Sequence, residues 1–126
     1  MSFLRFVFTS AVIFAALSVQ AQLQNYTKEL YKEAIHSGKP MVLYFHASWC
    51  PVCRKQKPLL SEILQEKGYE KFTSLIVDYD KETEIKSDLK VSTQATVVIF
   101  KSGKELIRKT GVTKKDELRK TIDMGL

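Results

Sequence analysis

The sequence predicts a mixed α/β fold in which a four-stranded sheet carries helices on both faces. Three apolar runs of β-forming residues alternate with helical patterns, and such strand–helix–strand units imply parallel strands joined by right-handed crossovers. A fourth run follows across Ser102-Gly103, a tight turn that predicts an antiparallel hairpin at the sheet edge. The chain has 126 residues, 44% of them hydrophobic, which suffices for one core but not for two.

The first half of the chain supplies two helices and one strand. Apolar residues recur at helical spacing over residues 25–37, and Gly38 ends that helix. Residues 40–46 are apolar and rich in β-forming side chains, which predicts a buried strand. A second helical pattern covers residues 50–66 and contains Pro58, where we expect a kink.

The second half supplies the remaining strands and two shorter helices. Residues 72–79 and 96–101 have strand patterns, and residues 82–89 form a short helix with weak patterning. Residues 105–110 return antiparallel after the tight turn. The last helix is expected over residues 113–124, with its first residue, a threonine, as the N-cap.

The N-terminal segment predicts export. Residues 1–5 carry one positive charge, residues 6–17 are almost entirely apolar, and small or modest residues precede Ala21. This pattern is typical of a secretory signal peptide. The apolar run is shorter than the roughly 20 residues that span a membrane, so cleavage after Ala21 is favoured over an uncleaved anchor. We expect a mature domain of residues 22–126 with no stable membrane insertion, located in the periplasm.

The charge of the chain does not indicate nucleic-acid binding. The formal net charge is +6, and loss of Arg5 with the signal peptide lowers Lys+Arg from 20 to 19 against 14 acidic residues, leaving +5. Basic residues are spread along the chain. The only dense run, residues 114–120, is interleaved with acidic residues, as in a solvated helix face.

The two cysteines, Cys50 and Cys53, stand where a strand ends and a helix begins. The free backbone N–H groups and the positive end of the helix dipole favour a thiolate there, so we expect Cys50 to be a nucleophile near neutral pH. Cys53 lies one turn on and is placed to attack a mixed disulfide at Cys50. Pro51 falls at the first helical position, where a missing N–H costs nothing.

Two other interpretations of the cysteine pair stay open on residue chemistry alone. Zinc normally takes four ligands, and the chain has neither a second cysteine pair nor a paired-histidine motif. Two thiolates and the imidazole of His46 suit a softer ion such as Cu(I), which would make the protein a copper-binding or delivery module. A third hypothesis is a fold kept as an interaction module without turnover.

Segments along nearly the whole mature chain resemble the thioredoxin superfamily in residues and spacing: Gly38-Lys39-Pro40, Phe45-His46-Ala47-Ser48-Trp49-Cys50-Pro51-Val52-Cys53, Pro58, Val77-Asp78-Tyr79-Asp80, Phe100-Lys101-Ser102-Gly103-Lys104-Glu105 and Gly111. The resemblance implies a thioredoxin-like fold whose first strand is missing or very short. It also implies thiol–disulfide exchange without a bound cofactor, with Cys50 as attacking thiolate and Cys53 as resolving thiol. With its signal peptide, the chain is similar to exported thioredoxin-like and Dsb-type proteins of Gram-negative bacteria. The implied partners of such a monomer are protein thiols and disulfides and an upstream redox protein.

Three departures from the family pattern bear on function. Ala95 occupies the position of the family's cis-proline, and we expect the Gln94–Ala95 bond to be trans because a cis bond without proline costs about 2.5–4 kcal/mol. Tyr44 occupies the position of a buried aspartate, and a phenol with a pKa near 10 is a poor base at neutral pH. The dipeptide between the cysteines is Pro51-Val52 in place of Gly-Pro.

The expected substrate surface combines the loop that carries the cysteines (the cysteine loop, residues 47–53) with the segment that faces it. Its residues are Trp49, Pro51, Val52, Gln94, Ala95 and Thr96. No histidine lies between the cysteines to stabilise the thiolate strongly, which favours a reductant or isomerase over a strong oxidant.

Overall fold

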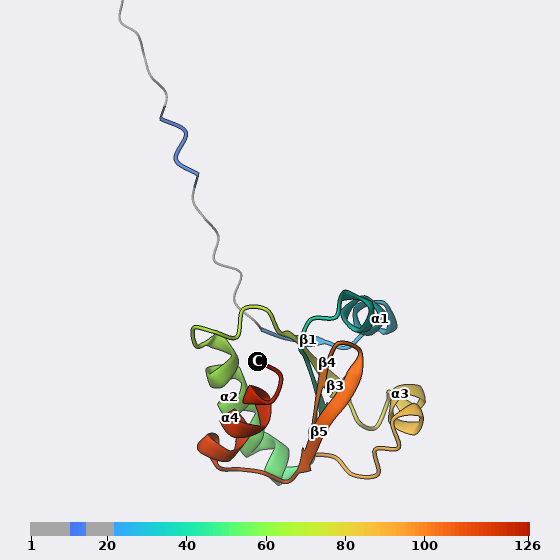
Figure 1. Cartoon of the computed structure of the whole chain (residues 1–126). Helices are drawn as coiled ribbons and strands as arrows, with labels where there is room; N and C mark the ends of the chain where they lie inside the picture. Colours follow the sequence, from blue (N-terminus) through green and yellow to red (C-terminus); the bar gives the residue numbers. More distant parts are fainter. Residues whose placement is uncertain (1–10, 15–21) are drawn as a thin grey trace, which may run out of the picture.

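Five strands form one mixed sheet in the order β1-β3-β2-β4-β5, with helices on both of its faces (Figure 1). The computed structural model describes residues 11–14 and 22–126, so the predicted signal peptide lies outside the described residues except for residues 11–14. The elements are β1 (Leu23–Asn25), α1 (Lys28–Ser37), β2 (Met41–His46), α2 (Pro51–Gln65), β3 (Thr73–Asp78), α3 (Thr83–Asp88), β4 (Thr96–Lys101), β5 (Lys104–Thr110) and α4 (Lys115–Asp123). Within the described part, no helix combines the length and apolar character needed to cross a membrane.

The sheet has one strand more than the four that the sequence predicted. β1 has three residues and pairs in parallel with β3, from Leu23 opposite Ser74 to Asn25 opposite Ile76. So short a segment carries no alternating pattern of its own, and the neighbouring edge of β3 provides its hydrogen-bond partners. Two of the other pairings are as predicted, with β2 parallel to β3 and β4 antiparallel to β5. The antiparallel pairing of β2 with β4 was not predicted, because the strand–helix–strand pattern implied parallel strands.

Strand β2 is central and is covered on both faces. Val42 and Tyr44 pack toward α2 and α4, while Leu43 and Phe45 pack in the second core with residues of α1 and α3. Burial on both faces explains why β2 reads as a continuous apolar run rather than an alternating one. The strand therefore holds its C-terminal end, where the cysteine loop starts, rigidly between two cores.

The helix ends follow the sequence signals at one helix and depart from them at another. Thr27 caps the N-terminus of α1, and Gly38 ends it in the left-handed conformation at φ 70°. At α4 the predicted Thr113 cap is wrong, because the N-cap is Lys114 and no side chain caps that end. Leu118 and Ile122 dock into the core, so packing rather than a cap sets where α4 lies.

Candidate active site

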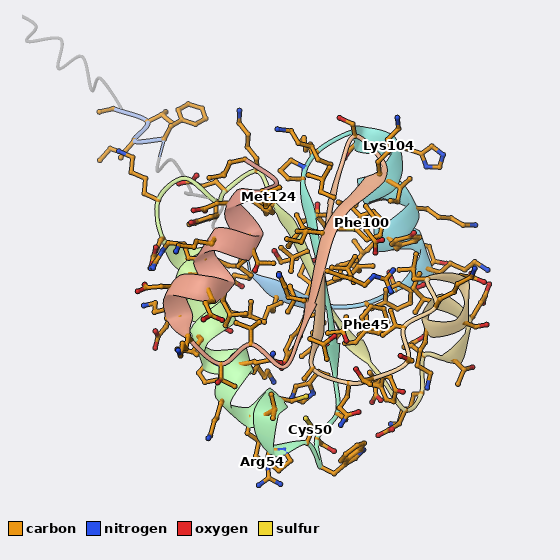
Figure 2. All side chains as sticks on the ribbon, turned by 60° about the horizontal axis from the view of Figure 1, so that its bottom comes forward. Phe45, Cys50, Arg54, Phe100, Lys104 and Met124 are labelled. Carbon is orange, nitrogen blue, oxygen red and sulfur yellow. The ribbon has the colours of Figure 1, made fainter. Side chains whose placement is uncertain are left out.

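The cysteine pair lies at the junction of β2 and α2, as the sequence predicts. Cys50 is the N-cap of α2, and its backbone N–H donates to the carbonyl of Ala47 at 3.2 Å. Its Sγ accepts a hydrogen bond from the backbone N–H of Cys53 at 3.2 Å. Figure 2 shows Cys50 and Arg54 at the end of the molecule where α2 starts. The helix N-terminus thus points a donor at the sulfur that would carry negative charge.

The two sulfurs differ in their surroundings. Both cysteines are free thiols, and both are buried, with Cys50 2% exposed. They form a small apolar cluster with Ala47 and Ala95. Burial, and after it the hydrogen bond with Cys50, raises the pKa of the Cys53 thiol. Cys53 is therefore protonated at neutral pH.

Tyr44 contacts the first turn of α2, the helix that begins at the cysteines. Its hydroxyl donates to the backbone carbonyl of Cys53 at 3.1 Å, and its ring is fully buried. Burial, followed by the proximity of Cys53, raises the pKa of the phenol further above its usual value. Tyr44 therefore stays protonated in the working pH range and anchors the first turn of α2 instead of acting as a base.

The segment that faces the cysteines has no cis peptide bond, as predicted for Gln94–Ala95; the described residues contain none. Ala95 instead adopts the left-handed region at φ 62°. Its N–H donates to the carbonyl of Phe45 at 2.8 Å, and its carbonyl accepts from the N–H of Gly111 at 3.0 Å. A proline at this position has no N–H and cannot make the first of these bonds.

The predicted substrate surface is assembled in part. Trp49, Pro51 and Val52 are exposed, with Trp49 54% exposed, and the Trp49 Nε1–H donates to Asp80 Oδ2 at 2.8 Å. Gln94 is half-buried at the edge of the facing loop. These four residues keep some exposed surface, as the expected substrate surface requires.

Two of the predicted surface residues are inside. Thr96 is only 3% exposed, and its Oγ1 donates to the carbonyl of Thr93 at 2.9 Å and lies 2.8 Å from Thr110 Oγ1. The expectation that it lines the surface is wrong, because Thr96 already belongs to β4, where it pairs with Thr110 and Phe45. Ala95 is also buried, in the apolar cluster that contains both cysteines.

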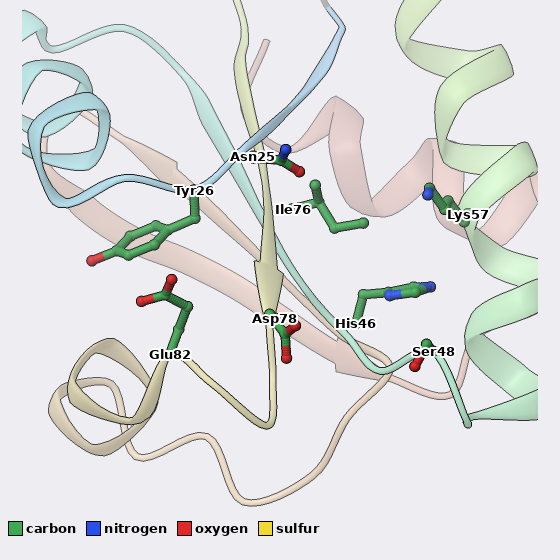
Figure 3. A pocket seen from close by; sticks show the side chains of 8 residues that line it. All are labelled: Asn25, Tyr26, His46, Ser48, Lys57, Ile76, Asp78 and Glu82. Atoms are coloured by element: carbon green, nitrogen blue, oxygen red, sulfur yellow. The ribbon is translucent and has the colours of Figure 1, made fainter.

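A polar pocket of about 380 Å³ opens beside the cysteine loop (Figure 3). It is lined by Asn25, Tyr26, His46, Ser48, Lys57, Ile76, Asp78 and Glu82. His46 lies edge-on to Tyr44, with the ring centroids 5.6 Å apart. Burial, and after it the positive charge of Lys57, lowers the pKa of His46, while Asp78 opposes this shift.

The copper hypothesis finds no assembled ligand set. Over residues 11–14 and 22–126 there is no group of three or more His, Cys, Asp or Glu residues arranged to hold a metal ion. His46 lines the polar pocket and does not join Cys50 and Cys53 as a third ligand.

Sequence reasoning missed Gln56. It lies on α2 one turn beyond Cys53, fully buried, and its Nε2 donates to the carbonyls of Ala95 and Val112 at 3.2 and 2.9 Å. The one available signal was its position, because it falls on the helix face that also carries Leu60 and Ile63. A polar residue on a buried stripe indicates a specific hydrogen-bond partner.

Comparison with known proteins agrees with this geometry. The sequence model of the family described as thioredoxin matches residues 22–124. The chain is 36% identical over 94 residues to thioredoxin H-type 1 of Nicotiana tabacum, covering 75% of this chain and 72% of that protein. It is 33% identical over 100 residues to the thioredoxin of Chlamydia trachomatis, covering 79% and 95%. The solved structure of Trxlp from Edwardsiella tarda superposes with a TM-score of 0.78 at 25% identity, covering 80% of this chain and 98% of that one. The chain belongs to the thioredoxin family of thiol–disulfide oxidoreductases.

Proposed function

We propose that this protein is an exported reductant or isomerase of protein disulfides, with Cys50 as the attacking and Cys53 as the resolving cysteine. The observation that carries the proposal is the hydrogen bond from the Cys53 N–H to the Cys50 Sγ at the start of α2. It directs a backbone donor at the Cys50 sulfur, while burial raises the pKa of Cys53 and keeps that second thiol protonated.

The exchange proceeds in two displacements. The Cys50 thiolate attacks one sulfur of the substrate disulfide, a Cys50–substrate bond forms, and the other substrate sulfur leaves as a thiolate. Cys53 then loses its proton and attacks the Cys50 Sγ, which breaks the mixed disulfide and releases the second substrate sulfur. Two electrons pass to the substrate, and the protein is left with a Cys50–Cys53 disulfide.

The proton on Cys53 needs an acceptor other than Tyr44, whose phenol is itself protonated and bonded to the Cys53 carbonyl. The substrate thiolate displaced in the first step is the nearest base that the reaction itself supplies. Transfer to it is uphill because burial raises the pKa of Cys53. Resolution is therefore slow at neutral pH and becomes faster as the pH rises.

The direction of exchange is tested by the reduction potential of the cysteine pair, equilibrated in glutathione and dithiothreitol buffers. A reductant is expected near −270 mV, and a value near −120 mV would place the protein among oxidants and overturn this part of the proposal. The matched activity test is reduction of insulin disulfides with dithiothreitol as electron donor. A Cys53→Ser variant, which can only form mixed disulfides, serves as the control.

The support for export is the character of residues 1–21, with its positive start, apolar stretch and small residues before Ala21. The working site is then the periplasm, where substrates are protein disulfides and an upstream redox protein returns the electrons to a monomer. N-terminal sequencing of the periplasmic protein should begin at Gln22, and an Ala21→Phe variant should keep the leader. A full-length chain recovered from the cytoplasm would contradict export.

A further inference from the structure

We propose that Gln56 is a positioning residue that holds the Gln94–Ala95 segment in the conformation that docks an extended substrate chain. The side-chain NH2 group of Gln56 donates to loop carbonyls and not to the reacting sulfurs, so Gln56 acts through Ala95. The inference rests on the proposed reduction of protein disulfides, because it names the element that holds the substrate backbone for that reaction.

Gln56 joins three parts of the molecule. It sits on α2, the helix that starts at the cysteines, and both donors of its side-chain NH2 group are engaged. One acceptor is the carbonyl of Ala95, in the loop facing the cysteines, and the other is the carbonyl of Val112, in the loop between β5 and α4. A single buried amide therefore fixes the distance between the cysteine helix and two loops.

A buried amide at this position destabilises the core relative to an apolar side chain. Gln56 is fully buried, and its Oε1 has no hydrogen-bond partner within the described part of the chain. A buried polar atom without a partner costs about 1–3 kcal/mol, which an apolar side chain of similar size such as methionine avoids. What methionine cannot supply is the pair of donors to the Ala95 and Val112 carbonyls. The polar residue thus serves the geometry of the loops rather than the stability of the core.

Ala95 needs this support because its backbone is strained. It is held at φ 62°, a region that costs a residue with a Cβ about 1–2 kcal/mol. Its N–H is bound to Phe45, and its carbonyl accepts from both Gly111 and Gln56. These contacts turn both polar groups of Ala95 inward and over-determine its conformation.

None of these contacts engages the backbone of Gln94. Among the described residues, no hydrogen bond engages the backbone N–H or carbonyl of Gln94, and the residue is half-buried beside the cysteine cluster. An extended chain can pair with such an edge, and its disulfide then lies over Cys50. Where the family resemblance places a rigid cis-proline, this chain uses alanine braced by the Gln56 amide.

The experiment compares Gln56→Met with Ser74→Ala in the full mature chain. Ser74 is the matched control because it is also fully buried with an unpartnered hydroxyl, yet it pairs with Val42 near the start of β2, away from the cysteines. Each variant is assayed with insulin, a protein disulfide, and with 5,5′-dithiobis(2-nitrobenzoic acid), a small disulfide that needs no backbone docking.

Gln56→Met should raise the KM for insulin about tenfold, because it removes roughly the net contribution of one hydrogen bond. It should change kcat much less. Its rate with the small disulfide should fall less than threefold, and the potential of the cysteine pair should stay unchanged. Ser74→Ala should alter none of these values. An unchanged KM for insulin, or an equal loss with both disulfides, would overturn the positioning role.

Two further measurements keep the inference testable if Gln56→Met does not fold. In the native protein, the side-chain NH2 protons of Gln56 should exchange slowly with solvent, and rapid exchange would contradict the inference. In Gln56→Glu, the ionised carboxylate cannot donate, so the KM for insulin should improve as the pH is lowered and the carboxyl gains a proton. A native protein that reduces the small disulfide but not insulin would instead refute the proposed function, independently of Gln56.

Discussion

The segment that carries the cysteines and the segment that faces them differ in what holds their backbones. Around Cys50 the contacts are local, because the sulfur caps its own helix through the Cys53 N–H and the proline sits at the first helical position. Around Ala95 they are distant in sequence, reaching Phe45, Gly111 and a glutamine on α2. The proposed nucleophile is therefore positioned by local contacts, whereas the proposed substrate edge is positioned by contacts that only the folded protein provides.

The largest expected effect comes from substituting the cysteines, which are positioned by local contacts. Cys50→Ser should lower insulin reduction by about three orders of magnitude, because the hydroxyl is a far weaker nucleophile than a thiolate near neutral pH. Cys53→Ser should also stop turnover but should accumulate a covalent mixed disulfide, visible by mass spectrometry of the intact protein. A Cys50→Ser variant that still traps substrate would reverse the two roles.

The next largest effect comes from substituting Ala95, which is positioned by contacts distant in sequence. Ala95→Pro should destabilise the protein by about 2 kcal/mol or more, because proline cannot reach φ 62° and cannot donate to Phe45. The urea midpoint measures this loss. Ala95→Gly is the control, since glycine tolerates the left-handed region and should leave stability within about 1 kcal/mol. If Ala95→Pro were as stable as the native protein, the contacts of Ala95 would not hold this loop in its left-handed conformation.

A smaller effect appears in the pH dependence of unfolding. The pKa of Cys53 is raised in the folded state, so folding favours its protonated form and stability falls as the pH rises above about 8.5, the pKa of an unfolded cysteine. Tyr44, and Tyr69 with its pKa raised to about 12, add a second decline above about pH 10. Urea unfolding across pH 7–11 measures both.

Oxidation and substitution separate the two declines. Closing the Cys50–Cys53 disulfide removes the titrating thiol, so the oxidised protein should lose stability only above about pH 10. Tyr44→Phe should make the decline above pH 10 shallower, with the contribution of Tyr69 remaining, and should leave the earlier decline in place. An identical pH profile for the oxidised and reduced proteins would mean that Cys53 does not titrate differently in the folded state.

The smallest effect concerns the exposed rim of the site. Asp80→Ala removes the acceptor of the Trp49 Nε1–H and should raise the KM for insulin by about two- to threefold through a less ordered ring, since an exposed hydrogen bond contributes only about 1 kcal/mol. The emission of this single tryptophan reports the change directly. Glu84→Ala, which breaks the exposed Lys28–Glu84 pair, should shift neither the emission nor the KM.

Prediction from sequence was most accurate where short-range chemistry sets the conformation. The buried strand β2, the start of α2 at Cys50 and the tight turn at Ser102-Gly103 are all found, the turn with positive φ at both residues. Prediction was least accurate where a contact with another element of the fold sets the conformation or the burial. β1 exists because β3 offers it an edge, and Thr96 is buried because β5 places Thr110 against its hydroxyl.

By itself the sequence determined the order of the elements from α1 to α4, the trans bond at Ala95 and the placement of Cys50 at a helix N-terminus. Apolar periodicity, peptide-bond energetics and capping all act over a few residues. Only the tertiary structure decided that Ala95 is left-handed and that its carbonyl meets Gln56, 39 residues earlier in the chain. Such a contact forms only after helix and sheet have packed, because no local pattern specifies which distant carbonyl a buried amide will reach.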